Sequence, residues 1–559
     1  MNALILAILT YAGFIIAYNT YGKFVGKKLF EITGQNVTPA HKMEDGFDYV
    51  PTKKKILFGH HFTSIAGTGP IVGPAIGVIW GWVPAVIWVV VGSIFMGAVH
   101  DFGALIISSR NKGKSLGDIT ADIVSPTSRK LFLTVIFFLL LIVIAVFAMI
   151  IGKLFIMYPA SVFPVWMEIP IALVLGYLVY KKGKNVTWLS IAAIILMYIT
   201  IWIGAKYLND FTMPSILGFS PIIVWVVILM IYAYIASALP VQTLLQPRDY
   251  INSHELLVAM GLLLLGLVIV HPTIVAPAVR TNVEGAPSMM PFLFITIACG
   301  AISGFHSLVS SGTSSKQLDN EQDAMPIGYG GMLLEGALAI LVILACTAGL
   351  GDSATWTARY VDWSSASSLG AKLGAFIDGG ASFVQGLGLS AAFAKTILAV
   401  FVVSFAATTL DTATRIQRYV VAEIAESMNI KPLTTKHGAT LFAVITAILL
   451  AMAKPGGAGA MILWPLFGAT NQLLAGLALM IITVYLAKKG KPVIFTIIPM
   501  IFMMFMTGWG MIDNIIGFFG KSEWLLFVIG IVIIVLEIWM IIEAINVVKK
   551  SKKEKKVKA

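Results

Sequence analysis

Apolar runs long enough to cross a lipid bilayer recur along the whole chain, and they constrain its fold more than any single motif does. A membrane-spanning helix needs about 20 mostly apolar residues. The chain of 559 residues is 58% hydrophobic and only 12% charged, which is too little charge to cover the surface of a water-soluble protein. The sequence therefore predicts an all-α polytopic membrane protein.

About fifteen apolar segments are candidate transmembrane helices. They are residues 3–21, 56–79, 83–109, 130–152, 166–180, 186–206, 220–246, 255–271, 290–311, 328–350, 389–424, 437–453, 459–487, 493–515 and 523–548. The first segment has no basic stretch before it, so we expect a retained helix and not a cleaved signal peptide. The two cysteines, Cys299 and Cys346, lie in apolar segments and predict neither a disulfide framework nor a thiolate metal site.

Basic residues in alternate loops predict the orientation of the chain in the membrane. The loop of residues 22–55 carries seven lysines, and the tail of residues 549–558 carries seven lysines and one glutamate. Basic loops stay on the cytoplasmic side, so we expect the N-terminus outside and the C-terminus in the cytoplasm, in the inner (cytoplasmic) membrane. The basic tail is expected to lie against anionic lipid, and nucleic acid is not an expected partner.

The stretch FGHHFTSIAGTGPIVGPAIG, residues 58–77, has the length of a spanning segment but interrupts a continuous helix. Pro70 and Pro74 remove two backbone donors, and the glycines around them disfavour a helix. In hydrocarbon, such a break survives only inside protein or along a wet cavity, where half-helix ends bind ligands. A proline-kinked structural helix without a ligand is the alternative. The residues expected to bind substrate at this break are His61, Ser64, Gly67, Thr68 and Gly69.

A second break is predicted at Pro240 in the segment 220–246, beside Gln242 and Thr243, which we expect to complete the substrate site. This segment is the fifth after the first broken one, so the two broken helices run in opposite directions. Such paired breaks are typical of inverted-repeat transporters with a binding site at the midplane. The predicted domains are 1–55 (N-terminal helix and cytoplasmic loop), 56–206 and 207–430 (two inverted repeats), and 431–559 (C-terminal helices and basic tail).

The segment 290–311 offers polar side chains to a coupling ion. Ser303, Ser307 and Ser310 share one helix face, and their hydroxyls could hold a small cation such as Na⁺. Close helix packing through small residues is the alternative. A proton carried by a histidine or a carboxylate is the other form of coupling, so the sequence leaves the coupling ion, H⁺ or Na⁺, open. The ion-coupling candidates are Asp101, Ser303, His306, Ser307, Ser310 and Ser311.

Charged residues near the ends of two segments are candidates for gates. Arg248 and Asp249 follow the second predicted break, and Asp411 and Arg415 lie four residues apart on one face of the segment 389–424. The last two can pair with each other within the helix, as a gating or a structural ion pair. Burying an ionisable residue inside a membrane costs free energy, so such residues are candidates for a functional role. Further titratable candidates for proton coupling are His60, His100 and Glu335.

Seven long stretches carry a resemblance to a known family. They are residues 58–77, GAVHDFGAL (97–105), SALPVQTLLQPRDY (237–250), ITIACGAISGFHSLVSSGTSSKQL (295–318), IGYGGMLLEG (327–336), FAATTLDTATRIQRY (405–419) and WPLFGATNQLLAGLAL (464–479). These stretches resemble the carbon starvation protein A family, placed by relationship in the amino acid–polyamine–cation transporter superfamily. The resemblance implies a LeuT-like core of five plus five inverted helices, with one helix before it and about four after it. It also implies ion-driven uptake of pyruvate or small peptides.

Two functions of different classes follow. The first is a secondary active transporter that imports a small carboxylate-bearing nutrient, peptide or pyruvate, by ion-coupled symport, with backbone N–H groups between Gly67 and Gly73 receiving the carboxylate. The second is a membrane-embedded metal or haem redox protein using His60 or His61 with His306, although their spacing does not support a ligand set. The sequence has no P-loop, GxGxxG unit, HExxH or CxxC. We therefore expect no enzyme and no cofactor, and the oligomeric state and metal binding stay open.

Overall fold

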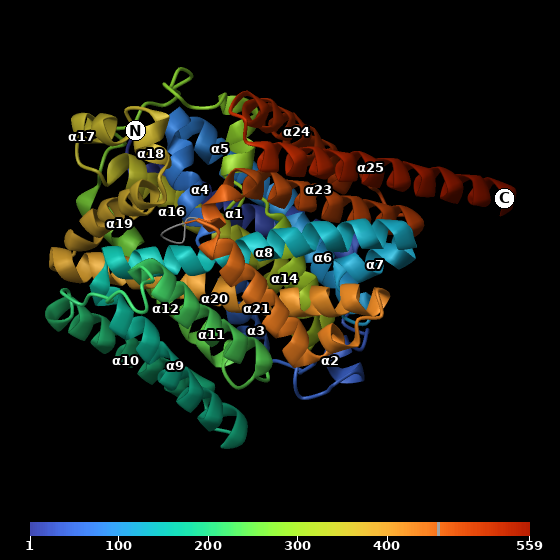
Figure 1. Ribbon diagram of the computed structural model, residues 1–559, viewed down its shortest axis with the longest axis horizontal. Helices are drawn as coiled ribbons and strands as arrows, with labels where there is room; N and C mark the ends of the chain where they lie inside the picture. The colour runs from blue at the N-terminus through green and yellow to red at the C-terminus, as the bar shows by residue number, and fades with distance from the viewer. Residues whose placement is uncertain (455–458, 559) are drawn as a thin grey trace.

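The computed structural model describes residues 1–454 and 459–558, and the regular structure there is helical (Figure 1). The first half of the chain forms α1 (Ala3–Ala17), α2 (Pro39–Lys42), α3 (Lys54–Ala66), α4 (Gly69–Gly77), α5 (Trp82–Gly92), α6 (Ala98–Arg110), α7 (Leu116–Ile123), α8 (Pro126–Met157), α9 (Val162–Gly176), α10 (Val186–Tyr207), α11 (Pro221–Ala238) and α12 (Leu245–Val270). The second half forms α13 (Met289–Thr296), α14 (Gly304–Val309), α15 (Ser315–Gln317), α16 (Gly331–Ala348), α17 (Ser353–Arg359), α18 (Trp363–Ser367), α19 (Leu369–Gln385), α20 (Ala391–Ser427), α21 (Lys436–Met452), α22 (Gly459–Ile462), α23 (Trp464–Lys488), α24 (Ile494–Gly520) and α25 (Trp524–Lys558).

Twelve helical segments of the described residues are long and apolar enough to cross a membrane, and the bent pair α3–α4 is a thirteenth. Some segments are two helices joined by a π-helical turn, as α5 and α6 are through Ser93–Gly97. Two predicted spans differ from this pattern: residues 290–311 fold as the short helices α13 and α14, and α21 has only 17 residues. The all-α polytopic architecture is confirmed, whereas the predicted count of fifteen transmembrane helices is not.

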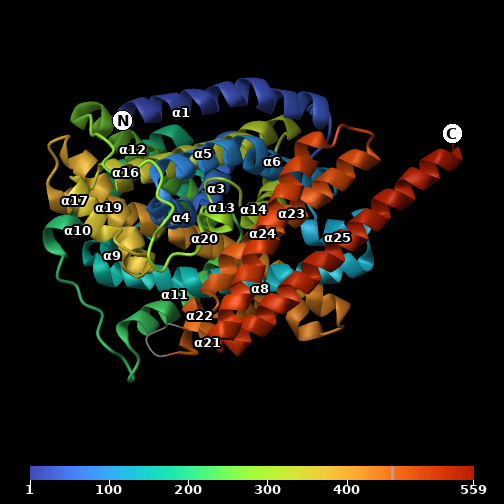
Figure 2. The same cartoon turned by 90° about the horizontal axis from the view of Figure 1, so that it is seen from above.

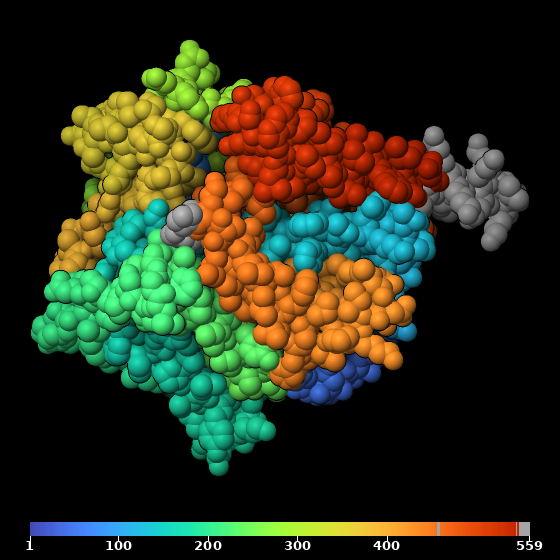
Figure 3. Space-filling model, viewed as in Figure 1, coloured from blue at the N-terminus to red at the C-terminus, as the bar shows by residue number. Residues whose placement is uncertain are grey.

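Two long helices, α8 and α20, pack against each other in the interior, and other helices surround them. In their most apolar parts, 83% and 78% of the residues are buried, against 28% in α10. Figure 2 shows α1 along one edge of the molecule, and Figure 3 shows the turn of the α9–α10 hairpin (teal) projecting from the body. The outer helices expose large apolar side chains, for example Ile8 of α1 and Phe505 of α24. Apolar surface of this extent is stable against lipid and not against water, so these helices face the bilayer.

The predicted interruption of the segment 56–79 is confirmed. α3 ends at Ala66, α4 begins at Gly69, and the helix axes are bent by 41°. Gly67 between them has φ +27° and ψ −152°, a conformation that L side chains rarely adopt. A Cβ at Gly67 would also lie 2.6 Å from Thr409 Oγ1 of α20. Both the backbone conformation and the available space therefore require glycine here.

The second break does not lie at Pro240, and this prediction is wrong. Pro240 lies in the connection between α11, which ends at Ala238, and α12, which begins at Leu245. Proline disfavours the helical conformation in the residue before it, and Leu239 is extended, with ψ 154°. The proline therefore ends a helix and does not interrupt one. The second break is at residues 297–303, between α13 and α14.

Candidate functional site

The two helix breaks lie against each other. A Cβ at Gly69, the first residue of α4, would lie 2.3 Å from Cys299 Sγ in the second break. A Cβ at Gly73, one turn later, would lie 2.6 Å from the carbonyl oxygen of Thr296, the last residue of α13. α3 also packs against α14. The start of α4 therefore meets the end of α13 and the second break, with glycine allowing the close approach.

Four ionisable side chains form a buried cluster beside the second break, called here the His306 cluster: His100 and Asp101 of α6, His306 of α14 and Glu335 of α16. The Asp101 carboxylate lies 3.0 Å from His306 Nδ1 and 2.7 Å from His100 Nδ1. Glu335 accepts a hydrogen bond from the backbone N–H of Gly300 at 3.0 Å, and its other oxygen lies 3.4 Å from His306 Nε2. All four side chains are fully buried. A chain of histidines and carboxylates inside a membrane is suited to carrying protons.

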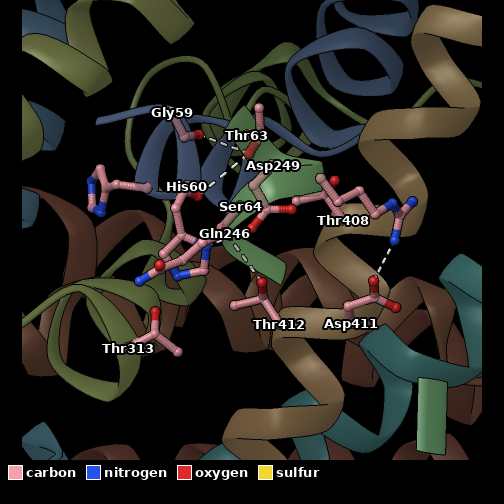
Figure 4. A network of polar contacts seen from close by, with 12 residues as sticks. Gly59, His60, Thr63, Ser64, Gln246, Asp249, Thr313, Thr408, Asp411 and Thr412 are labelled. Atoms are coloured by element: carbon pink, nitrogen blue, oxygen red, sulfur yellow. Dashed lines mark hydrogen bonds and ion pairs between the residues drawn. The ribbon is translucent and has the colours of Figure 1, made fainter. Parts of the chain in front are cut away.

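The adjacent histidines of α3 point to different partners. His60 Nδ1 lies 2.5 Å from Asp249 Oδ2 of α12 (Figure 4), whereas His61 Nδ1 lies 2.9 Å from Ser314 Oγ. Neighbouring side chains on a helix diverge by about 100°, and this explains the separation. The predicted gating residue Asp249 thus fixes the half-helix that leads into the first break.

The other residues predicted to bind substrate at the first break are brought together there. Ser64 Oγ of α3 lies 3.0 Å from Thr412 Oγ1 of α20, and Figure 4 shows the two side chains pointing toward one another. Gly67 and Thr68 are buried, and Gly69 is half-buried. The first break therefore presents Ser64 and Gly67 to α20 and Gly69 to the second break.

Gln242 and Thr243 lie elsewhere, in the turn between α11 and α12. Gln242 is half-buried and Thr243 is exposed. Their carbonyl oxygens would lie 3.3 and 3.4 Å from a Cβ at Gly176 of α9. Because the second break is at residues 297–303, neither residue is part of it. Their role in substrate binding stays a prediction without the support of a helix break.

The serines predicted to hold a cation are mostly engaged in helix structure. Asn471 of α23 donates to Ser303 Oγ at 3.0 Å. The hydroxyls of Ser307 and Ser311 each donate to a carbonyl oxygen one turn earlier, at 2.7 Å. The buried Ser310 Oγ has no hydrogen-bond partner in the described part of the chain. A hydroxyl that donates its proton keeps its oxygen lone pairs, and within the described residues neither Ser307 Oγ nor Ser310 Oγ accepts a hydrogen bond, so both oxygens can act as ion ligands.

A second group of buried side chains, called here the Arg248 cluster, joins four helices: Arg248 of α12, Glu168 of α9, Tyr232 of α11 and Asp411 of α20. Arg248 Nε donates to Glu168 Oε1 at 3.0 Å, and Arg248 Nη1 donates to Asp411 Oδ2 and to the Tyr232 hydroxyl. Ser404 Oγ donates to the second oxygen of Glu168 at 3.2 Å. One guanidinium therefore holds two buried carboxylates from different helices, an arrangement that fails if one partner is lost.

The predicted pairing of Asp411 with Arg415 is wrong, because each residue binds another partner. Arg415 Nη1 lies 2.8 Å from Asp48 Oδ1, and Arg415 Nη2 donates to the carbonyl oxygens of Ala236 and Leu239 at the end of α11. The Arg415 guanidinium has several N–H donors, and two carbonyl oxygens at a helix end together with a carboxylate satisfy more of them than Asp411 alone would. Arg415 therefore anchors the loop before α3 to the end of α11.

Asp48, in the loop between α2 and α3, also binds the next basic residue of α20. Arg418 Nη2 lies 3.1 Å from Asp48 Oδ2, and the Tyr419 hydroxyl donates to Asp48 Oδ1 at 2.6 Å. Burial alone would raise the pKa of Asp48, but the charges of Arg418 and Arg415 outweigh it and hold the pKa below its usual range. The ionised Asp48 therefore ties this loop to α20 at neutral pH.

Sequence reasoning missed Glu168 and Tyr232 of the Arg248 cluster and Cys299 of the second break. Glu168 is a single carboxylate within the apolar segment 166–180, and this isolation is itself a signal of a functional candidate. Cys299 carries no such signal, because a free cysteine in an apolar segment packs as a small apolar residue. Its position against Gly69 follows from the tertiary structure alone.

The fold is shared with a solved transporter. Structures of two mutants of the Eremococcus coleocola manganese transporter match this chain with TM-scores of 0.52 and 0.51 at 14% and 12% sequence identity. Each match covers 91% of this chain and 99% of that transporter. At such low identity the likeness shows the fold alone.

Named relatives match most of the chain. The peptide transporter CstA of Campylobacter jejuni is 34% identical over 93% of this chain and 81% of that protein. The peptide transporter CstA of Escherichia coli is 34% identical over 88% and 78%, and the pyruvate/proton symporter BtsT of Escherichia coli is 31% identical over 91% and 81%. The family model for carbon starvation protein CstA matches residues 2–355 and 355–510. The chain therefore belongs to the carbon starvation protein CstA family of membrane transporters.

Proposed function

We propose that this chain is a secondary active transporter that imports a small carboxylate-bearing nutrient, a peptide or pyruvate, by ion-coupled symport and alternating access. Relatives named peptide transporter and pyruvate/proton symporter support this substrate class. Their identities to this chain, 34% and 31%, do not choose between the two substrates. Peptides and pyruvate share a carboxylate, and the proposed site recognises that group.

The observation that carries the proposal is the meeting of two helix breaks beside a cluster of buried charge, the His306 cluster. Transporters bind substrates at unwound helices midway through the bilayer. The N-terminus of α4 at Gly69 would receive the carboxylate with a backbone N–H and the positive end of the helix dipole. Ser64 and Thr68 are the nearest hydroxyls in the sequence. Because the breaks touch at Gly69 and Cys299, they must separate to admit a substrate, and alternating access supplies that motion.

Coupling to protons has more support than coupling to Na⁺. The His306 cluster places two histidines and two carboxylates within hydrogen-bonding or ion-pair distance beside the second break. The serine face, by contrast, offers neutral hydroxyl oxygens, those of Ser307 and Ser310 among the described residues. The relative named as a proton symporter agrees with this choice. We therefore propose that His100 and Asp101 of the His306 cluster carry the coupling proton.

The core of the proposed transporter is two inverted repeats, each beginning with a broken helix. The first repeat would begin at α3–α4, and the second at α13–α14 and not at residue 207. α8 and α20 would then be equivalent long helices, and they pack against each other in the interior. α1 precedes this core, and α24 and α25 follow it.

The proposed orientation places the N-terminus outside and the C-terminus in the cytoplasm of a cell-membrane transporter. Basic loops from three parts of the chain meet around one surface cavity of about 1210 Å³. They supply Lys27 and Lys42, Arg110 and Lys112, and Lys489 to its lining. A shared basic face is what the positive-inside rule predicts for the cytoplasmic side.

Uptake into proteoliposomes tests the proposal. Labelled pyruvate and a labelled dipeptide are offered separately, with either a pH gradient (acid outside) or an inward Na⁺ gradient imposed. We expect one substrate to accumulate above its equilibrium level under the pH gradient, and the accumulation to collapse when a protonophore is added. Accumulation driven by Na⁺ alone would overturn proton coupling, and no accumulation of either substrate under either gradient would overturn the substrate class.

A further inference from the structure

Three side chains of different metal-binding types converge at the second helix break. Ligand atoms of Cys299, in the break itself, of His306 on α14 and of Glu335 on α16 all lie within 4.8 Å of one another. His306 and Glu335 are fully buried, and Cys299 is half-buried. The sequence alone predicted no thiolate metal site, because these residues are seven and twenty-nine positions apart in a pattern that matches no metal motif.

Two of these ligand atoms lack the partners that buried polar atoms normally have. Within residues 1–454 and 459–558, neither His306 Nε2 nor Glu335 Oε2 has a hydrogen-bond partner, although they lie 3.4 Å apart. A buried polar group without a partner is costly. A cation between the imidazole, the carboxylate and the thiolate would satisfy both atoms at once.

The surrounding hydrogen bonds orient these atoms toward one another. Asp101 lies 3.0 Å from His306 Nδ1, so the proton of the imidazole is held on Nδ1 and the lone pair of Nε2 is free. The N–H of Gly300 holds Glu335 Oε1 at 3.0 Å, which leaves Oε2 available. A carboxylate behind a histidine is the usual outer-shell partner of a metal-ligating histidine.

We propose that Cys299 Sγ, His306 Nε2 and Glu335 Oε2 bind one divalent transition-metal ion of the zinc class. Thiolate and imidazole ligands favour such ions over Na⁺, Mg²⁺ or Ca²⁺, which prefer oxygen. Three protein ligands leave a fourth position open for water or another small ligand. Cys299 contacts the first break at Gly69, so a carboxylate entering between the breaks would reach the open position, a consequence that rests on the proposed function.

Metal binding by the purified full-length protein tests this proposal without any transport assay. The protein is stripped with a chelator and titrated with Zn²⁺, with elemental analysis, and separately with Co²⁺, with optical absorption. We expect about one ion per chain and a cobalt–thiolate charge-transfer band. Cys299→Ser should abolish the band. The matched control, Cys346→Ser, should retain it, because Cys346 is the other cysteine of the chain and lies outside the ligand set.

Two further variants keep the test decisive if Cys299→Ser fails to fold. Glu335→Gln removes a ligand and should lower the affinity. Asp101→Asn leaves all three ligands and should weaken binding about 10- to 100-fold, as loss of an outer-shell partner does. Thermal unfolding of each metal-free variant reports whether it is folded. Absence of saturable Zn²⁺ binding by the wild-type chain, or a cobalt band that survives Cys299→Ser, would overturn the proposal.

Discussion

At the residue scale, the buried charges find partners far away along the chain. His60 and Asp249 are 189 positions apart, and Asp48 and Arg415 are 367 positions apart. Ionisable groups are rare in apolar segments, so the sequence identifies these residues as exceptional. A single sequence does not show which of them pair with each other. The wrong pairing of Asp411 with Arg415 came from a rule for neighbours on an isolated helix. In the packed protein, each of the two residues pairs with a residue from a distant part of the chain instead.

Loss of the Arg248 guanidinium is expected to destabilise the fold strongly. Arg248→Met leaves Glu168 and Asp411 buried without their cation, and breaking a buried pair in this way costs about 3–5 kcal/mol. Arg359→Met is the matched control, because Arg359 and Asp378 are each 32% exposed, and an ion pair that water reaches contributes less to stability than a fully buried one. Denaturant unfolding in detergent measures the free energy of unfolding of both variants. Equal losses would contradict the account.

The contribution of Asp48 to stability is expected to depend on pH in the acid range. Its pKa is lower in the folded protein than in the unfolded chain, so the stabilisation is present above the unfolded pKa of about 4 and is lost as the pH falls through the folded pKa. The difference in thermal unfolding temperature between wild type and Asp48→Asn should therefore be constant at neutral pH and shrink in acid. A difference that grows as the pH falls would show that this sign is wrong.

At the element scale, one helix break was predictable and the other was not. Gly67, Pro70 and Pro74 lie close together at the first break, and such a density of helix-breaking residues inside an apolar segment predicts an interrupted helix. Residues 297–303 hold one glycine and no proline, so their break depends on tertiary contacts. The predicted break at Pro240 was wrong because a proline can mark the end of a helix as well as an interruption within one. The presence of a helix can be predicted from the local sequence pattern, whereas which two breaks meet depends on how the helices pack.

A methyl group at Gly69 is expected to force the two breaks apart. Its Cβ would lie 2.3 Å from Cys299 Sγ and 2.5 Å from Cys299 Cβ, and overpacking of this kind costs about 1–3 kcal/mol. We expect Gly69→Ala to lower the uptake rate by about tenfold, the equivalent of about 1.4 kcal/mol. Gly13→Ala in α1 is the control, because a Cβ there meets no atom of the described chain within 4 Å. Wild-type uptake by Gly69→Ala would show that the close contact is not needed.

At the scale of the whole molecule, composition predicts that the outer helices face lipid, but it does not predict the number of transmembrane helices. Hydropathy locates apolar helices well, but it cannot separate a spanning helix from two half-helices such as α13 and α14. The positions of His61, Ser64, Gly67, Thr68 and Gly69 at the first break follow from their own local sequence. The side chains of the His306 cluster come from three separate helices, so their proximity could not be predicted without the three-dimensional fold.

Removal of the central carboxylate of the His306 cluster is expected to uncouple transport from the pH gradient. Asp101→Asn should abolish accumulation under an acid-outside gradient while exchange of labelled for unlabelled substrate continues, because exchange needs no net proton movement. Glu537→Gln is the control, since Glu537 is a buried carboxylate of the C-terminal helix α25. Proteoliposome uptake and counterflow measure both steps. Gradient-driven accumulation by Asp101→Asn would remove Asp101 from the proton path.

The central claim is that substrate binds between the two helix breaks, and the native cysteine at the second break reports on this directly. In a Cys346→Ser background, Cys299 is the single cysteine of the chain, and its rate of alkylation by a membrane-permeant maleimide can be measured with the metal content held constant. The account predicts that saturating pyruvate or dipeptide, whichever is transported, changes this rate several-fold, while a non-transported analogue does not. An alkylation rate that is unaffected by a substrate the same protein transports would contradict it.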